Sequence, residues 1–200
     1  MLVLNLLEQI YFFNIGPANR DDTYFEWRNE TFNKPTLFEI KFARRAPIKD
    51  LFFCISKVDE KIVYYHHCET DIVFSIGSRP EVQSQLLEAL IEYLIENFFY
   101  TFDKSLLQTC YGDQCDIFSS FQEIVENAFI NYEKLNLIKI VLVTCKGCKK
   151  TIPVVIKKTL VEKSQKSNTP LVYSHSGHAV LIYIDKQFQI RGDEIVGVSY

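Results

Sequence analysis

Residues 78–99, SRPEVQSQLLEALIEYLIENFF, decide the fold because the apolar residues change their spacing here. Before this stretch apolar residues alternate as in strands, and within it Val82, Leu86, Leu90, Leu94 and Phe98 recur at four-residue steps. This spacing predicts one continuous helix over residues 82–98 that buries a broad face against a sheet. The segment 78–81 fits a capping box, with serine as N-cap and glutamate three residues later.

The chain before residue 78 is typical of β-structure. Runs rich in β-branched and aromatic residues, bounded by glycine, proline or polar tips, occur at 9–15, 37–43, 51–56, 62–66 and 71–76. They predict an antiparallel meander of roughly five strands. Residues 18–33 are polar apart from a few aromatics, and we expect a loop with a short helix there.

The chain after the long helix divides into a helical and a β-rich part. Asp116 can cap a second helix, whose buried stripe is Phe118, Phe121, Ile124 or Val125, Ala128 and Tyr132. The run 137–144 is almost continuously apolar, which is typical of a strand covered on both faces. Beyond it we expect a strand at 151–156, a short helix within 157–166 and hairpins formed by 171–175, 179–184 and 188–191.

These elements predict an α/β (α+β) protein. Its first domain, residues 1–136, is an antiparallel meander sheet packed by two helices, and residues 137–200 form a small β-rich module. Alternatively, the strand at 137–144 completes the first sheet and fuses the two units.

Two pairs of metal-binding residue types lie in the C-terminal module. Cys145 and Cys148 bracket two residues, and so do His175 and His178, so each pair can close a tight turn. Two thiolates and two imidazoles complete a tetrahedral structural zinc site, which has no open position for a substrate. Nearby lysines would favour the thiolates by lowering the thiol pKa.

Other interpretations of the cysteines stay open. Cys110 and Cys115 could replace the histidines as ligands, or the CxxC pair could be a redox-active dithiol or a reduced turn. A redox CxxC usually opens a helix, whereas here a β-branched segment with a proline follows. The run His66-His67-Cys68 lies in a strand pattern, where neighbours point to opposite faces, and makes a poor chelate.

Composition limits the function classes. The net charge is -3, and the main basic concentration is at lysines 146, 149, 150, 157 and 158, so a zinc-ribbon-like nucleic-acid-binding protein is only an alternative. We find no glycine-rich phosphate loop and no paired catalytic carboxylates, and we expect no enzyme. No apolar run approaches the roughly 18–20 residues that span a bilayer, and the N-terminal stretch lacks a basic leader, so we expect a cytoplasmic protein without stable membrane insertion.

The order of elements through residue 136, with helical parts at 86–102 and 110–132, resembles longin and roadblock-type (profilin-like) domains. Such domains serve as platforms for small GTPases and in vesicle-trafficking complexes. The resemblance implies a non-catalytic adaptor that binds a small GTPase or a longin-like subunit. The sequence departs from the family pattern in two ways. The usual helix between the second and third strands is reduced here to residues 24–33, and the Cys/His unit, which looks like a zinc-ribbon-like appendage, is not part of the ordinary longin fold.

Three consecutive aromatic residues end the long helix. Phe98, Phe99 and Tyr100 cannot all face one core, because consecutive helical residues point in different directions. We therefore expect part of this surface to bind a partner, or a second copy of the chain in a homodimer. Alternatively, the C-terminal module covers it.

Overall fold

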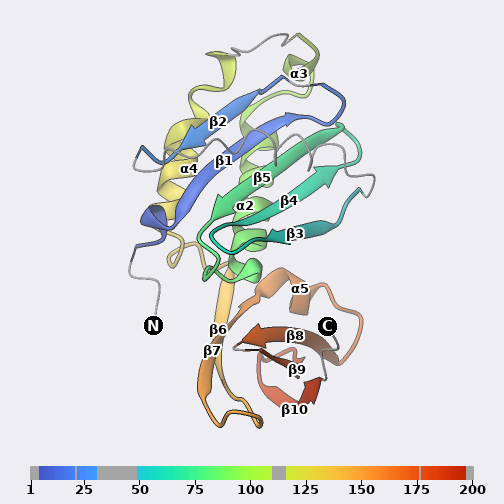
Figure 1. Ribbon diagram of the computed structural model, residues 1–200. Coiled ribbons are helices and arrows are strands. Elements are labelled where there is room, and N and C mark those ends of the chain that lie inside the picture. The colour runs from blue at the N-terminus through green and yellow to red at the C-terminus, as the bar shows by residue number, and fades with distance from the viewer. Residues whose placement is uncertain (1–4, 21, 31–48, 110–115, 176, 197–200) are drawn as a thin grey trace. The chain divides into compact units, whose positions relative to one another are not determined.

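The computed structural model describes residues 5–20, 22–30, 49–109, 116–175 and 177–196 (Figure 1). The protein is mixed α/β with antiparallel sheets, as expected from the sequence at this level. It divides into two compact units, Leu2–Leu135 and Asn136–Tyr200.

The N-terminal unit contains one sheet in the order β2-β1-β5-β4-β3, with every described pair antiparallel. The strands are β1 (Ile10–Pro17), β2 (Phe25–Arg28), β3 (Phe52–Ser56), β4 (Lys61–His67) and β5 (Ile72–Ser78), preceded by the 3-10 turn η1 (Leu6–Glu8). The strands expected near 9–15, 51–56, 62–66 and 71–76 are confirmed. The strand expected at 37–43 lies outside the described residues.

Two details of the predicted sheet are wrong. Part of the expected loop with a short helix is the edge strand β2, in which Phe25 pairs with Ile15 and Trp27 with Phe13. With only four residues, β2 is too short for its alternation to stand out in a polar segment. The sheet is also no simple meander, because β1 pairs directly with β5 and so joins the β1–β2 hairpin to the β3–β5 meander.

The predicted long helix is present as α2 (Ser84–Thr101), but it begins two residues later than expected and the capping box is wrong. Ser78 is still paired with Ile10 and Lys61 as the last residue of β5, so the chain must leave the sheet before it can turn into a helix. The N-cap is Gln83, which makes no side-chain capping hydrogen bond. No helix in the described part of the chain is long and apolar enough to cross a membrane.

The core of the N-terminal unit is built around Phe98. Its ring lies 5.2 Å from that of Phe102 and 5.3 Å from those of Phe118 and Phe121, and it meets Phe74 of β5 edge-on at 5.8 Å. Such tilted and edge-to-face pairs add to the free energy gained by burial. The cluster joins α2 to the sheet and to the segment that follows it.

That segment contains α3 (Leu106–Thr109), the 3-10 turn η2 (Asp116–Phe118) and α4 (Phe121–Ile130). The second predicted helix is therefore present, although it begins at Phe121 after a separate turn at Asp116. Its predicted stripe is buried, apart from the half-buried Ile124.

The three consecutive aromatic residues at the end of α2 differ in their exposure to solvent. Phe98 is fully buried, and the half-buried Phe99 packs against Phe74 and the ring of His67. Tyr100 is 92% exposed. The N-terminal unit thus covers two of the three with its own sheet, and only Tyr100 projects into solvent.

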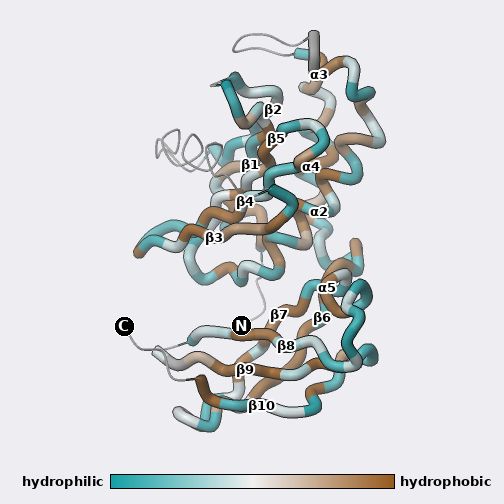
Figure 2. The backbone as a smooth tube through the Cα atoms, turned by 90° about the vertical axis from the view of Figure 1, so that its right-hand side faces the viewer, coloured by the Kyte–Doolittle hydropathy of each residue, from teal (hydrophilic) through white to brown (hydrophobic). Residues whose placement is uncertain are grey.

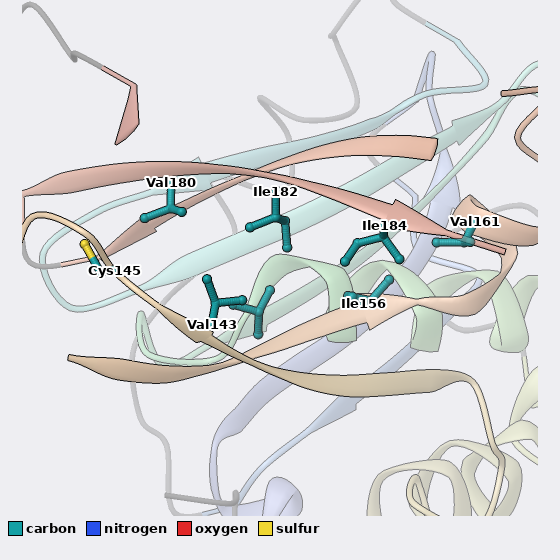
Figure 3. Packing of buried hydrophobic residues seen from close by; sticks show 8 residues of the cluster. Val143, Cys145, Ile156, Val161, Val180, Ile182 and Ile184 are labelled. Atoms are coloured by element: carbon teal, nitrogen blue, oxygen red, sulfur yellow. The ribbon is translucent and has the colours of Figure 1, made fainter. Parts of the chain in front are cut away.

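The C-terminal unit packs a two-stranded ribbon against a three-stranded sheet (Figures 2 and 3). The ribbon is β6 (Ile138–Thr144) and β7 (Thr151–Lys157); after α5 (Lys158–Glu162) the sheet follows as β8 (Asn168–His175), β9 (His178–Asp185) and β10 (Ile190–Val196). Aliphatic side chains fill the space between them: Val143, Val154, Ile156, Val161, Val180, Ile182 and Ile184. Because β6 pairs with β7, it does not complete the first sheet.

The expectation that β6 is covered on both faces is wrong. Val143 on the inner face is buried, whereas Ile140 and Leu142 on the other face are 39% and 68% exposed. An apolar run does not reveal whether the strand enters a large sheet or a two-stranded ribbon. In a ribbon only one face meets the core.

We predict that Gly77→Ala destabilises the N-terminal unit. The ring of Phe12 lies over Gly77, and an added Cβ would come within 2.1 Å of a ring carbon. Overpacking of this kind costs about 1–3 kcal/mol, measurable by denaturant unfolding followed through the fluorescence of the single tryptophan, Trp27.

A matched control is Gly192→Ala, where an added Cβ meets only Tyr183 at 3.6 Å. We expect it to leave the stability nearly unchanged. If Phe12→Leu failed to relieve the effect of Gly77→Ala in the double variant, the steric explanation would be wrong.

Candidate metal centre

Cys145 and Cys148 lie in the turn that connects β6 and β7. The amide of Cys145 donates to the carbonyl of Lys150 at 2.9 Å, and the amide of Lys149 donates back to the carbonyl of Cys145 at 2.8 Å. Lys149 takes the left-handed conformation, with φ 61°, which reverses the chain. The backbone thereby forms a tight knuckle that brings both thiols together.

His175 reaches this knuckle from the other layer of the unit. It is the last residue of β8, which is positioned by its pairing with β9, and β9 packs on the ribbon. Its Nε2 lies 3.4 Å from the Sγ of Cys148. The ligand atoms of Cys145, Cys148 and His175 all lie within 4.8 Å of one another.

The environment of Cys145 favours the thiolate. Its pKa is lowered to about 7, first by the backbone N–H of Cys148 and next by the His175 side chain, with the Gly147 N–H also contributing. The lysines named from the sequence are not among these causes. Lys146 instead forms an ion pair with Asp193, 3.1 Å from its Oδ2, and donates to its carbonyl at 2.7 Å.

This donor set fits a tetrahedral zinc ion. At the usual bond lengths of zinc, a thiolate sulfur and an imidazole nitrogen are about 3.6 Å apart, close to the 3.4 Å between Cys148 and His175. Cys145 is buried and the other two residues are half-buried. Two thiolates and an imidazole are soft and borderline donors, which suit zinc better than magnesium or calcium.

The remaining sequence candidates divide into two groups. The β8–β9 register places His178 opposite His175, but its side chain lies outside the described residues, and so do Cys110 and Cys115. His66 and His67 have other partners: Nε2 of His66 lies 2.8 Å from Asp71, and Nδ1 of His67 lies 2.9 Å from the hydroxyl of Thr70. Among the residues described, the histidines of β4 therefore join no metal-binding group.

The lowered pKa of Cys145 also suits the redox interpretation, but the local structure lacks the helix that usually accompanies a redox-active CxxC pair. The CxxC pair lies between β6 and β7, so it does not open a helix. The stabilisation of a thiolate by a helix dipole, common in redox-active CxxC sites, is absent from this turn.

No sequence pattern singled out Asp193, which ties the turn that holds Cys145 and Cys148 to β10 through Lys146. The two residues are 47 positions apart, and either charge alone looks like an ordinary surface residue. Only the pairing of β10 with β9 brings them together.

Comparisons with known proteins give no family assignment. The chain matches no protein-family model, and no curated protein matches it significantly.

We predict about one equivalent of zinc per chain purified without chelator. Cys148→Ser and His175→Ala should each reduce the zinc content to below about a tenth of an equivalent, because a ligand is lost. The control Cys54→Ser, at an exposed cysteine of the N-terminal unit, should keep the metal. Elemental analysis measures all three variants.

Chelation gives an independent readout. We expect a strong chelator to lower the unfolding temperature of the C-terminal unit, because the metal binds only the folded turn. Cobalt(II) in place of zinc should show the absorption of tetrahedral thiolate coordination. A zinc-free native chain, or variants with unchanged zinc content, would contradict the site.

Proposed function

We propose that this chain is a non-catalytic protein-interaction adaptor. Its N-terminal unit acts as a longin-like platform for a small GTPase or a longin-like subunit, as in trafficking complexes. Its C-terminal unit is a zinc-ribbon-like module held by a structural zinc ion.

The element order of the N-terminal unit supports the platform. A five-stranded antiparallel sheet is followed along the chain by α2 and α4, which pack against it and against each other (Figure 1). This is the order that the longin resemblance implies, and fold analogy of this kind carries function only by association. The surfaces that remain accessible must therefore carry the argument.

The observation that carries the proposal is the edge strand β3. In the described sheet it pairs only with β4. The amide of Lys57 donates to the carbonyl of Glu60, so these two residues form a hydrogen-bonded pair of the β3–β4 hairpin. Since such pairs alternate, the backbone groups of Cys54 and Ser56 point away from β4. Both residues are exposed, so a partner's strand can extend the sheet there.

Zinc supports the C-terminal unit by closing its metal-binding turn. The unit is small, and the hydrophobic core of a domain below about 70–80 residues rarely supplies more than about 3–5 kcal/mol, so a bound metal can add substantially to its stability. Cys145, Cys148 and His175 supply three ligands, and the register makes His178 the natural fourth. With four protein ligands, the ion stabilises the fold and leaves no position for a substrate.

We predict that Cys54→Pro weakens partner binding at least about tenfold, because it deletes an outward amide and spares the β3–β4 hydrogen bonds. The control Cys54→Ser keeps that amide and should bind normally. The partner is first captured from native cytosol and identified by mass, and the affinity is then measured with the purified partner.

This proposal requires a particular class of partner. A strictly monomeric chain that captures no small GTPase and no longin-like subunit would contradict it. Equal affinities of Cys54→Pro and Cys54→Ser would show that β3 is not the docking edge.

A further inference from the structure

The outer edge of β6 presents a row of backbone groups that point away from β7. The Lys158 amide donates to the Leu137 carbonyl at 3.0 Å, and the Cys145 amide to the Lys150 carbonyl at 2.9 Å. With the register of the ribbon, these two bonds show that the odd-numbered residues of β6 are hydrogen-bonded to β7. The N–H and C=O groups of the even-numbered residues, Ile138, Ile140, Leu142 and Thr144, therefore point outward.

Nothing in the described part of the chain pairs with this edge. Ile140 and Leu142 are also the exposed apolar residues of the strand. A depression of about 280 Å³ lies beside it, lined by residues 142–144, by Ile190 and Asp193 of β10, and by Lys146 and Lys149. A long apolar edge without blocking charges in its middle is a ready template for another strand.

Charge indicates what kind of strand fits. Residues 136–200 carry ten lysines and arginines against four aspartates and glutamates, a net charge of +6 with histidine neutral. Residues 1–135 carry the other twelve basic and twenty-one acidic residues, a net charge of -9. The small overall charge of the chain thus hides a strongly basic unit, and Lys139, Lys149 and Lys150 of the ribbon are exposed.

These charges disfavour two other occupants. A second copy of β6 would bring two basic units together, and like charges across a strand pair are destabilising. A nucleic acid is disfavoured because none of the exposed side chains of β6, those of Lys139, Ile140, Leu142 and Thr144, is aromatic, whereas bases stack on aromatic rings. The carboxylates of an acidic segment can pair with the lysines, and its backbone can pair with the outward groups of β6.

We propose that the outer edge of β6 binds an extended acidic segment of a partner protein as an added β-strand. Outward backbone groups supply the hydrogen bonds, Ile140 and Leu142 contact the apolar residues of the segment, and the ribbon lysines attract its carboxylates. This site lies wholly within the C-terminal unit and does not depend on the proposed function of β3.

The test uses the full zinc-loaded chain and a fluorescent peptide of about nine residues that alternates glutamate and valine, long enough to line a strand. The control peptide replaces glutamate with lysine. We expect the acidic peptide to bind at least about tenfold more tightly, and its affinity to fall as salt rises from about 0.05 to about 0.5 M. Amide exchange should slow at the four even-numbered residues of β6 and not at their odd-numbered neighbours.

Two variants separate the backbone edge from the charges. Leu142→Pro removes an outward amide without breaking the ribbon and should reduce binding at least about tenfold, whereas Leu142→Ala should cost less. Leu142→Glu leaves every backbone group in place and adds one negative charge to the edge, so we expect it to reduce the preference for the acidic peptide. Zinc content shows that each variant remains folded.

Several outcomes would overturn the proposal. They are an acidic peptide that does not bind at millimolar concentration, equal binding of the two peptides, and unchanged binding by Leu142→Pro. A thymidine oligonucleotide that displaces the peptide at a lower concentration would assign the surface to nucleic acid. A dimer that Leu142→Pro dissociates would assign the edge to a second copy.

Discussion

The packing of the β6–β7 ribbon on β9 is the contact on which the C-terminal unit depends. Val143 and Ile156 on one layer meet Val180, Ile182 and Ile184 on the other (Figure 3), and each buried aliphatic side chain contributes about 1.5–3 kcal/mol. The same contact brings Cys148 and His175, which are 27 positions apart, to within 3.4 Å. The approach of the three potential ligands, Cys145, Cys148 and His175, is therefore a consequence of aliphatic packing, and a bound ion would in turn resist the separation of the two layers.

The two units combine opposite electrostatic characters with different kinds of core. The acidic N-terminal unit is held by aromatic rings around Phe98, whereas the basic C-terminal unit is held by branched aliphatic residues. Each unit ends its sheet or ribbon at a strand whose outward backbone groups can pair with another chain. The two proposed docking edges thus belong to units of opposite net charge, -9 and +6.

The sequence predicted those elements whose signal is long and local. The helix α2 is 18 residues long, about five turns, so its apolar stripe predicted the helix even though Ser78 remained in β5. The CxxC turn was equally local, and the matching spacing of the histidines pointed to His175. Features that depend on contacts between distant segments could not be predicted in this way. The strand β2 is recognisable only by its pairing with β1, and β6 has one covered face because it packs on β9. The ion pair of Lys146 with Asp193 depends on the position of β10.

The uninterrupted apolar run of β6 has a consequence for the uniqueness of the fold. Ile140, Val141, Leu142 and Val143 are all apolar, so a slip of one residue would exchange the inner and outer side chains without burying a charge among these four. Hydrophobicity alone thus does little to choose between the two alignments of the hairpin. A bound metal ion would favour the observed alignment, because a slipped strand would carry Cys145 away from His175. Zinc would then fix the register of the β6–β7 hairpin. Its loss would allow a misaligned hairpin that exposes apolar side chains and is prone to aggregation.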